Sequence, residues 1–94
     1  MTATQTTIAE LTELWQTIFP TIPAPDTRQF AIWLLRFQPY IVRQGIANLA
    51  LKADREPDMD LDWMYRYASA SMANIHNRDA AKLAGEYTRR PQQD

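Results

Sequence analysis

The stretch TRQFAIWLLRF, residues 27 to 37, contains the longest unbroken apolar run of the chain, FAIWLL at 30 to 35. Its main apolar residues recur at intervals of three and four, the spacing of one helical face: Phe30, Trp33, Leu34 and Phe37. Ile32 and Leu35 point to the other side, because each residue turns a helix by about 100°. A helix that is apolar on both sides is either central in a fold or partly an interface.

Upstream of this segment, helix-starting residues and prolines predict a first helix and a loop. Thr7 followed by Glu10 has the capping-box spacing and predicts a helix over residues 8 to 19. The loop FPTIPAPD, residues 19 to 26, cannot continue that helix, because its prolines lack backbone donors and restrict their neighbours. Asp26 then has the right type and position to cap the second helix.

A third helix is predicted to begin at Pro39, with Gln38 as its cap, and to end near Asp54. Its core-facing residues share one face: Val42, Ile46, Leu49 and Ala53. Gly45 lies beside them and would let a neighbouring backbone approach closely, at a cost of about 1 kcal/mol in helix propensity relative to alanine. Tyr40 and Leu51 point away from this face.

The fourth helix is expected to pack from about residue 60 to the middle of the seventies and to continue as a more exposed segment. Its core stripe is Leu61, Met64, Ala68, Met72 and Ile75. Leu83 extends this face, Asp79 interrupts it, and the final RRPQQD should fray. We therefore predict an all-α fold, a compact bundle of four helices in a single domain over residues 1–94. The core covers about 7–76, and 77–94 form an exposed helical extension and frayed tail.

Composition restricts the class of protein. The chain has 94 residues, 46% of them hydrophobic and 22% charged, which suits one small globular domain. It has no cysteine, so disulfides and thiolate metal sites are excluded. The opening MTATQTTIAE does not resemble a secretory signal, and no apolar run is long enough to cross a membrane. We expect a cytoplasmic protein without a membrane partner.

The net charge of −1 hides an uneven distribution. From Arg28 to Lys52 the chain has no acidic residue. The basic residues of this stretch include Arg28, Arg36 and Arg43. The following acidic segment, residues 54 to 62, has acids at every second position: Asp54, Glu56, Asp58, Asp60 and Asp62. Such a dipolar molecule can orient a charged partner. The alternative is an ordinary solvated surface.

The acidic segment resembles the start of a calcium loop, but Trp63 stands where glycine is needed and Ser69 where a bidentate glutamate belongs. Carboxylates also gather at helix N-termini, where unpaired N–H groups and the helix dipole attract them. We expect Asp60 to cap the fourth helix, with Asp58 as the alternative. His76, the only histidine, is expected on the surface. The sequence predicts no metal, cofactor or catalytic residue, hence no enzyme.

Trp63, Arg66 and Tyr67 follow the acidic segment and lie opposite the predicted core stripe. Tryptophan, tyrosine and arginine are enriched at interface hot spots, so this trio is a candidate protein-binding surface. The second candidate surface is the basic stripe of Arg28, Arg36 and Arg43. The alternative for the aromatic pair is burial beneath the N-terminal segment or the proline-rich loop. A homodimer through Ile32 and Leu35, or through Trp63, is also open.

Nucleic-acid binding is the alternative function. Aromatic and basic residues alternate in WMYRY, residues 63 to 67, as on platforms for single strands, but the acids just upstream would repel phosphates. A helix-turn-helix formed by the second and third helices would read bases with few suitable side chains: Arg43, Gln44, Asn48 and Lys52. A nucleic-acid-binding regulator would use the basic stripe of the second and third helices.

The pattern over residues 8 to 75 resembles the small phage-encoded replicative-helicase loader and inhibitor proteins. The residues that carry the resemblance are Phe19 and Pro20, Trp33 and Leu34, Val42 and Ile46, Pro57, and the helix from Leu61. The resemblance implies a compact helical N-terminal domain and a flexible C-terminal part that engages the hexameric helicase. That would place residues 83 to 94 at the partner, although here this region is compatible with a helix. The function expected is non-catalytic binding and modulation of a larger protein machine in DNA replication.

Overall fold

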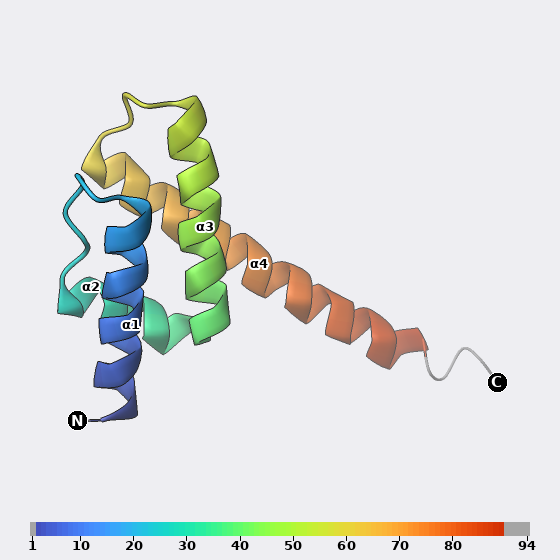
Figure 1. Ribbon diagram of the computed structural model, residues 1–94. Helices are drawn as coiled ribbons and strands as arrows, with labels where there is room; N and C mark the ends of the chain where they lie inside the picture. Colours follow the sequence, from blue (N-terminus) through green and yellow to red (C-terminus); the bar gives the residue numbers. More distant parts are fainter. Residues whose placement is uncertain (1, 90–94) are drawn as a thin grey trace.

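Four helices make up the fold (Figure 1). The computed structural model describes the backbone of residues 2–89 and the side chains of residues 2–85. The helices are α1 (Ala3–Ile18), α2 (Thr27–Arg36), α3 (Pro39–Arg55) and α4 (Leu61–Arg89). No strand occurs within residues 2–89. The predicted all-α, four-helix architecture is confirmed.

The first helix begins earlier than predicted. Its N-cap is Thr2, whose Oγ1 accepts a hydrogen bond from the Gln5 backbone N–H at 3.1 Å. The Gln5 side chain accepts in return from the Thr2 backbone N–H at 2.9 Å, which completes a capping box. The expectation of a cap at Thr7 was wrong: the Thr7 hydroxyl donates to the Ala3 carbonyl, inside the helix, at 3.0 Å.

The starts of the other helices follow the prediction closely. Asp26 caps α2, because its Oδ1 accepts from the Gln29 N–H at 2.8 Å. Asp60 caps α4 in the same way, accepting from the Trp63 N–H at 2.7 Å. Pro39 occupies the start of α3, although Gln38 supplies no side-chain hydrogen bond there. These caps fix where each helix enters the bundle.

The core is built around two tryptophans, and each is fully buried with its indole N–H paired. Trp33 Nε1 donates to Ser69 Oγ at 2.8 Å and so joins α2 to α4. Trp15 Nε1 donates to the Ile22 carbonyl at 3.2 Å and so holds the proline-rich loop against α1. Among the described residues the buried apolar side chains run from Ile8 to Ile75. The helix that packs on all three others is α3, most extensively on α4, so the expectation that the second helix is the central one was wrong.

The α3 and α4 helices approach most closely at Gly45. A Cβ atom added there would lie 2.5 Å from Met72 Cγ and 3.2 Å from the Ala68 carbonyl oxygen. Both distances are shorter than ordinary van der Waals contact, so only glycine fits without a shift. The close approach inferred from the sequence is therefore present.

Beyond Ile75, α4 leaves the bundle and projects into solvent (Figure 1). Of residues 76–85, only Asp79 is partly buried, and Leu83 is 64% exposed. The predicted extension is thus helical to Arg89, with side chains described to Gly85. Of the segment RRPQQD predicted to fray, Arg89 is the last residue of the helix, and residues 90–94 lie outside the described residues. The assignment of Leu61 to the core was wrong, since it is 38% exposed at the first position of α4.

Candidate protein-binding surfaces

The first candidate surface is the N-terminal part of α4. Trp63 is 50% exposed, and its backbone N–H is held by the Asp60 cap. Arg66 lies one turn further and forms an ion pair with Asp62, with Nε and Oδ2 3.1 Å apart. Both partners of this pair are largely exposed, so the pair contributes little to stability. The Arg66 guanidinium can therefore exchange Asp62 for another carboxylate at low cost.

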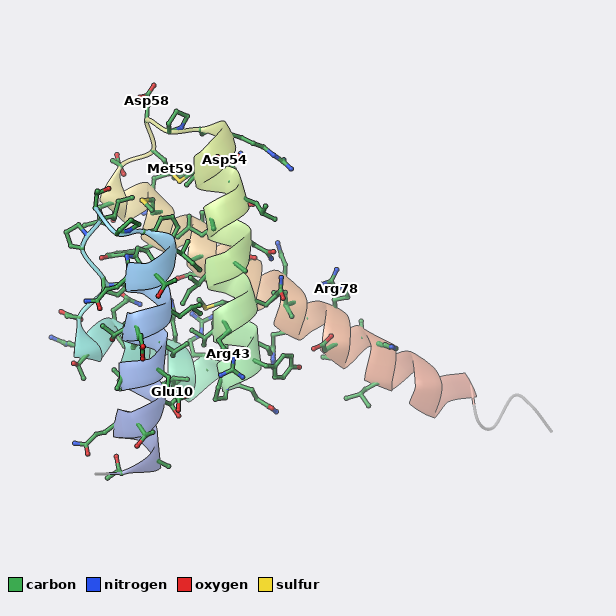
Figure 2. All side chains as sticks on the ribbon, in the orientation of Figure 1. Glu10, Arg43, Asp54, Asp58, Met59 and Arg78 are labelled. Carbon is green, nitrogen blue, oxygen red and sulfur yellow. The ribbon has the colours of Figure 1, made fainter. Side chains whose placement is uncertain are left out.

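A surface hollow of about 400 Å³ lies beside the Trp63 ring. Its walls come from the turn that joins α3 to α4: Arg55, Glu56, Pro57, Asp58 and Met59. Figure 2 shows Asp54, Asp58 and Met59 at this turn and Arg43 at the other end of α3. The acidic segment therefore lies at the C-terminal end of α3, whereas Arg43 lies toward its N-terminal end.

Tyr67 differs from Trp63 in its surroundings. It is only partly exposed and packs against the core, with Lys52 Nζ of α3 5.7 Å from its ring centroid. Lys52 in turn pairs with Glu56 one turn along α3. Trp63 and Tyr67 are therefore not two equivalent exposed rings, and Tyr67 lies at the edge of the surface, where α3 meets α4.

Tyr65 was missed as a structural residue. Its ring lies 5.9 Å from Trp15 and 6.4 Å from Trp33, both in edge-on geometry, measured between centroids. Burial raises the pKa of its hydroxyl, and the Asp26 carboxylate raises that pKa further. The available signal was its place beside Met64 of the core stripe, which puts it toward the junction with α1 and α2.

The three arginines of the basic stripe are all exposed. Arg28 and Arg36 lie two turns apart on α2, about 12 Å at 1.5 Å per residue, and Arg43 lies on α3. None of them forms an ion pair with another residue whose side chain the structure describes. The Arg36 guanidinium lies 5.1 Å from the Phe37 ring centroid, a cation–π distance.

A groove of about 550 Å³ separates the α2–α3 corner from the projecting part of α4. Tyr40 and Asp79 bridge it, with the Tyr40 hydroxyl donating to Asp79 Oδ2 at 2.7 Å. This hydrogen bond is the main cause of a raised Tyr40 pKa. Leu35, 86% exposed, and Leu83 stand at its edges. The sequence pattern marks Leu35, Tyr40 and Asp79 as departures from the apolar stripes and Leu83 as a continuation of one, but it does not bring the four together as a site.

His76 is exposed at this groove, with its ring 6.0 Å from that of Phe37. Within residues 2–85, no three histidine, aspartate or glutamate side chains come together in a way that could hold a metal ion. The carboxylate of Asp60, the centre of the calcium-like pattern, is used as a helix cap.

Comparison of the chain with family models, with curated proteins and with solved structures gave no match. In the part of the chain that the structure describes, no helix has the length and apolar character to cross a membrane.

Proposed function

We propose that this chain is a small non-catalytic interaction protein that binds a larger protein through Trp63 and Arg66, with Tyr67 at the edge of the surface. The observation that carries the proposal is the half-exposed Trp63 indole, fixed on the capped first turn of α4 beside a hollow. A large aromatic ring held in place loses little entropy on binding, and such rings dominate interface energies.

The partner proposed is a replicative helicase or a similar multi-subunit machine, on the basis of the resemblance to phage helicase loaders and inhibitors. Two features support a modulator of this kind. The bundle is small and presents α4 as a projecting arm, and the hollow at Trp63 has acidic and apolar walls that suit a basic or mixed partner surface.

The test is a binding titration of the labelled protein against a purified hexameric replicative helicase. Trp63→Ala should weaken binding by about 2 kcal/mol or more, roughly 30-fold, as expected for a hot-spot ring. Leu51→Ala is the matched control: Leu51 is 63% exposed, but it lies about 200° around α3 from the buried Leu49. Equal affinities for wild type and Trp63→Ala would remove the basis of the proposed surface.

A second candidate function, nucleic-acid binding, is favoured by one observation. Arg28, Arg36 and Arg43 are exposed and have no ion-pair partner among the described side chains, in a stretch that contains no acid. Binding of this type releases counterions, so the affinity would fall steeply with salt and Arg43→Gln would reduce that slope. A weak salt dependence with retained Arg43→Gln binding would exclude it.

A further inference from the structure

The groove between the α2–α3 corner and α4 has two walls with matching chemistry. The α2 wall presents Leu35 and, next to it, Arg36, whereas the α4 wall presents Asp79 and, one turn on, Leu83. Each wall therefore offers an exposed leucine and a charged side chain. The charge on the α2 wall is positive and the charge on the α4 wall is negative.

The two leucines are among the most exposed large apolar residues described, at 86% for Leu35 and 64% for Leu83. Ile32, three residues before Leu35 on α2, is exposed as well and continues the apolar edge. In a chain this small nearly every large apolar side chain is needed in the core. A groove with apolar edges of this size is a candidate contact surface.

The two charges of the groove do not satisfy each other within the molecule. No ion pair joins Arg36 to Asp79, and neither forms an ion pair with another side chain within residues 2–85. Asp79 accepts the Tyr40 hydroxyl, but a carboxylate has about four acceptor positions and can also receive a guanidinium. Arg36 and Asp79 are thus available to opposite charges brought in from outside.

We propose that the occupant of this groove is a second copy of the chain, related by a two-fold axis. Leu35 then packs on Leu83 of the second copy, Arg36 pairs with Asp79 of the second copy, and symmetry repeats both contacts. A two-fold interface requires a surface that is its own complement, and a groove with one leucine on each wall and opposite charges meets that requirement. A partner surface with charges of one sign only would place a like charge against either Arg36 or Asp79.

This inference does not rest on the proposed function. Trp63 lies sixteen residues before Asp79 on α4, about 24 Å away at 1.5 Å per residue, so the dimer leaves the Trp63 surface free. A dimer would present two such surfaces, and binding to a symmetric oligomer would gain from their linkage.

Sedimentation velocity over a concentration series tests the proposal with the full chain. The wild type should move from 10.9 kDa toward twice that mass as concentration rises. Arg36→Asp and Asp79→Arg should each raise the dimer dissociation constant at least tenfold, because each places like charges opposite one another at both symmetric contacts. Mixed in equal amounts, the two variants should form a heterodimer, since both contacts then join opposite charges.

Mixing the two variants shows whether Arg36 and Asp79 pair between molecules. If a substitution prevented dimerisation by disturbing its own molecule, mixing would not restore the dimer. Leu35→Asp should also give a monomer, and Leu51→Asp, at an exposed leucine of α3 that does not line the groove, should still dimerise. Far-UV circular dichroism confirms that each variant is folded. The proposal is overturned if the wild type keeps the monomer mass up to its solubility limit, or if the mixed charge variants stay monomeric.

Discussion

Replacing Gly45 with alanine tests the packing that positions α4. Gly45 lies inside α3, where glycine costs helix stability, so an alanine would be favourable in an isolated helix. In the folded protein, however, the added Cβ would lie 2.5 Å from Met72 Cγ and 3.2 Å from the Ala68 carbonyl oxygen. The first atom belongs to a fully buried side chain and the second to backbone, so neither yields freely.

The expected change in the free energy of unfolding is the difference between a gain in helix propensity and a loss in packing. Alanine gains about 1 kcal/mol in helix propensity over glycine. Adding a methyl group to a filled core typically costs about 1–3 kcal/mol. We expect the upper part of that range, because the Cβ meets the fully buried Met72 side chain at both Cγ and Cε, at 2.5 and 3.0 Å, and also meets the Ala68 backbone. Gly45→Ala should thus lower the free energy of unfolding by about 1 kcal/mol, which lowers the Tm of a domain of this size by about 4–8 °C.

Urea and thermal denaturation followed by circular dichroism give the measurement. Gly85→Ala is the matched control, because Gly85 also lies in a helix but a Cβ there would meet no atom within 4 Å, so it should gain stability. In a double-mutant cycle, Met72→Ala should cost less in the Gly45→Ala background than in the wild type. If Gly45→Ala gains as much stability as Gly85→Ala, the inferred close approach of α3 and α4 is wrong.

Two further predictions concern α4. Asp60→Ala should lower the free energy of unfolding by about 1 kcal/mol in urea titrations, because the Trp63 N–H loses its cap, whereas Asp58→Ala should change it by less than about 0.5 kcal/mol. Tyr65 has a pKa raised by folding, so it contributes stability below its ordinary pKa of about 10, and this is lost as pH rises through the higher folded value. Urea midpoints measured across that alkaline range should therefore fall more for the wild type than for Tyr65→Phe, and equal falls would contradict the assignment.

The parts of the fold that depend on local chemistry could be predicted from the sequence. The Asp26 and Asp60 caps follow from a carboxylate placed three residues before an N–H it can accept from. The need for a small residue at Gly45 follows from its place beside the stripe of α3. Each cap involves residues within one turn of each other, so the caps require no knowledge of how the helices cross. The residues that Gly45 meets, Met72 and Ala68 of α4, could not be predicted in this way.

The start of α1 shows where local reasoning was insufficient. Thr2 with Gln5 and Thr7 with Glu10 have the same capping-box spacing, and the apolar stripe begins only at Ile8. The stripe therefore favoured the later start. In the structure the extra turn begins at the Thr2–Gln5 capping box, whose two hydrogen bonds satisfy backbone N–H groups at the start of the helix.

The groove and the surroundings of Tyr67 depend on the angle at which α4 crosses the other helices. The spacing of apolar residues along the sequence does not determine this angle. Helical spacing places Tyr67 opposite the stripe, but α4 lies close enough to α3 for Lys52 to reach over its ring. Leu61 belongs to the same stripe as Met64, yet at the first position of the helix it extends past the residues that cover Met64. The exposure of a residue at a helix end is therefore determined by the neighbouring elements rather than by its position in the apolar stripe.

Asp79 lies on the part of α4 that projects from the bundle, and this part bears on both the proposed dimer and the proposed helicase complex. The part of α4 beyond Ile75 continues a packed helix, so it has no nucleation cost of its own, but few tertiary contacts stabilise it. The Tyr40–Asp79 hydrogen bond supplies one contact, and a second copy would supply more by covering Leu83. If a helicase instead bound this arm, as the resemblance implies, the dimer and the helicase complex would exclude each other. If it bound Trp63, the two associations would be independent, because the surfaces lie on separate parts of α4.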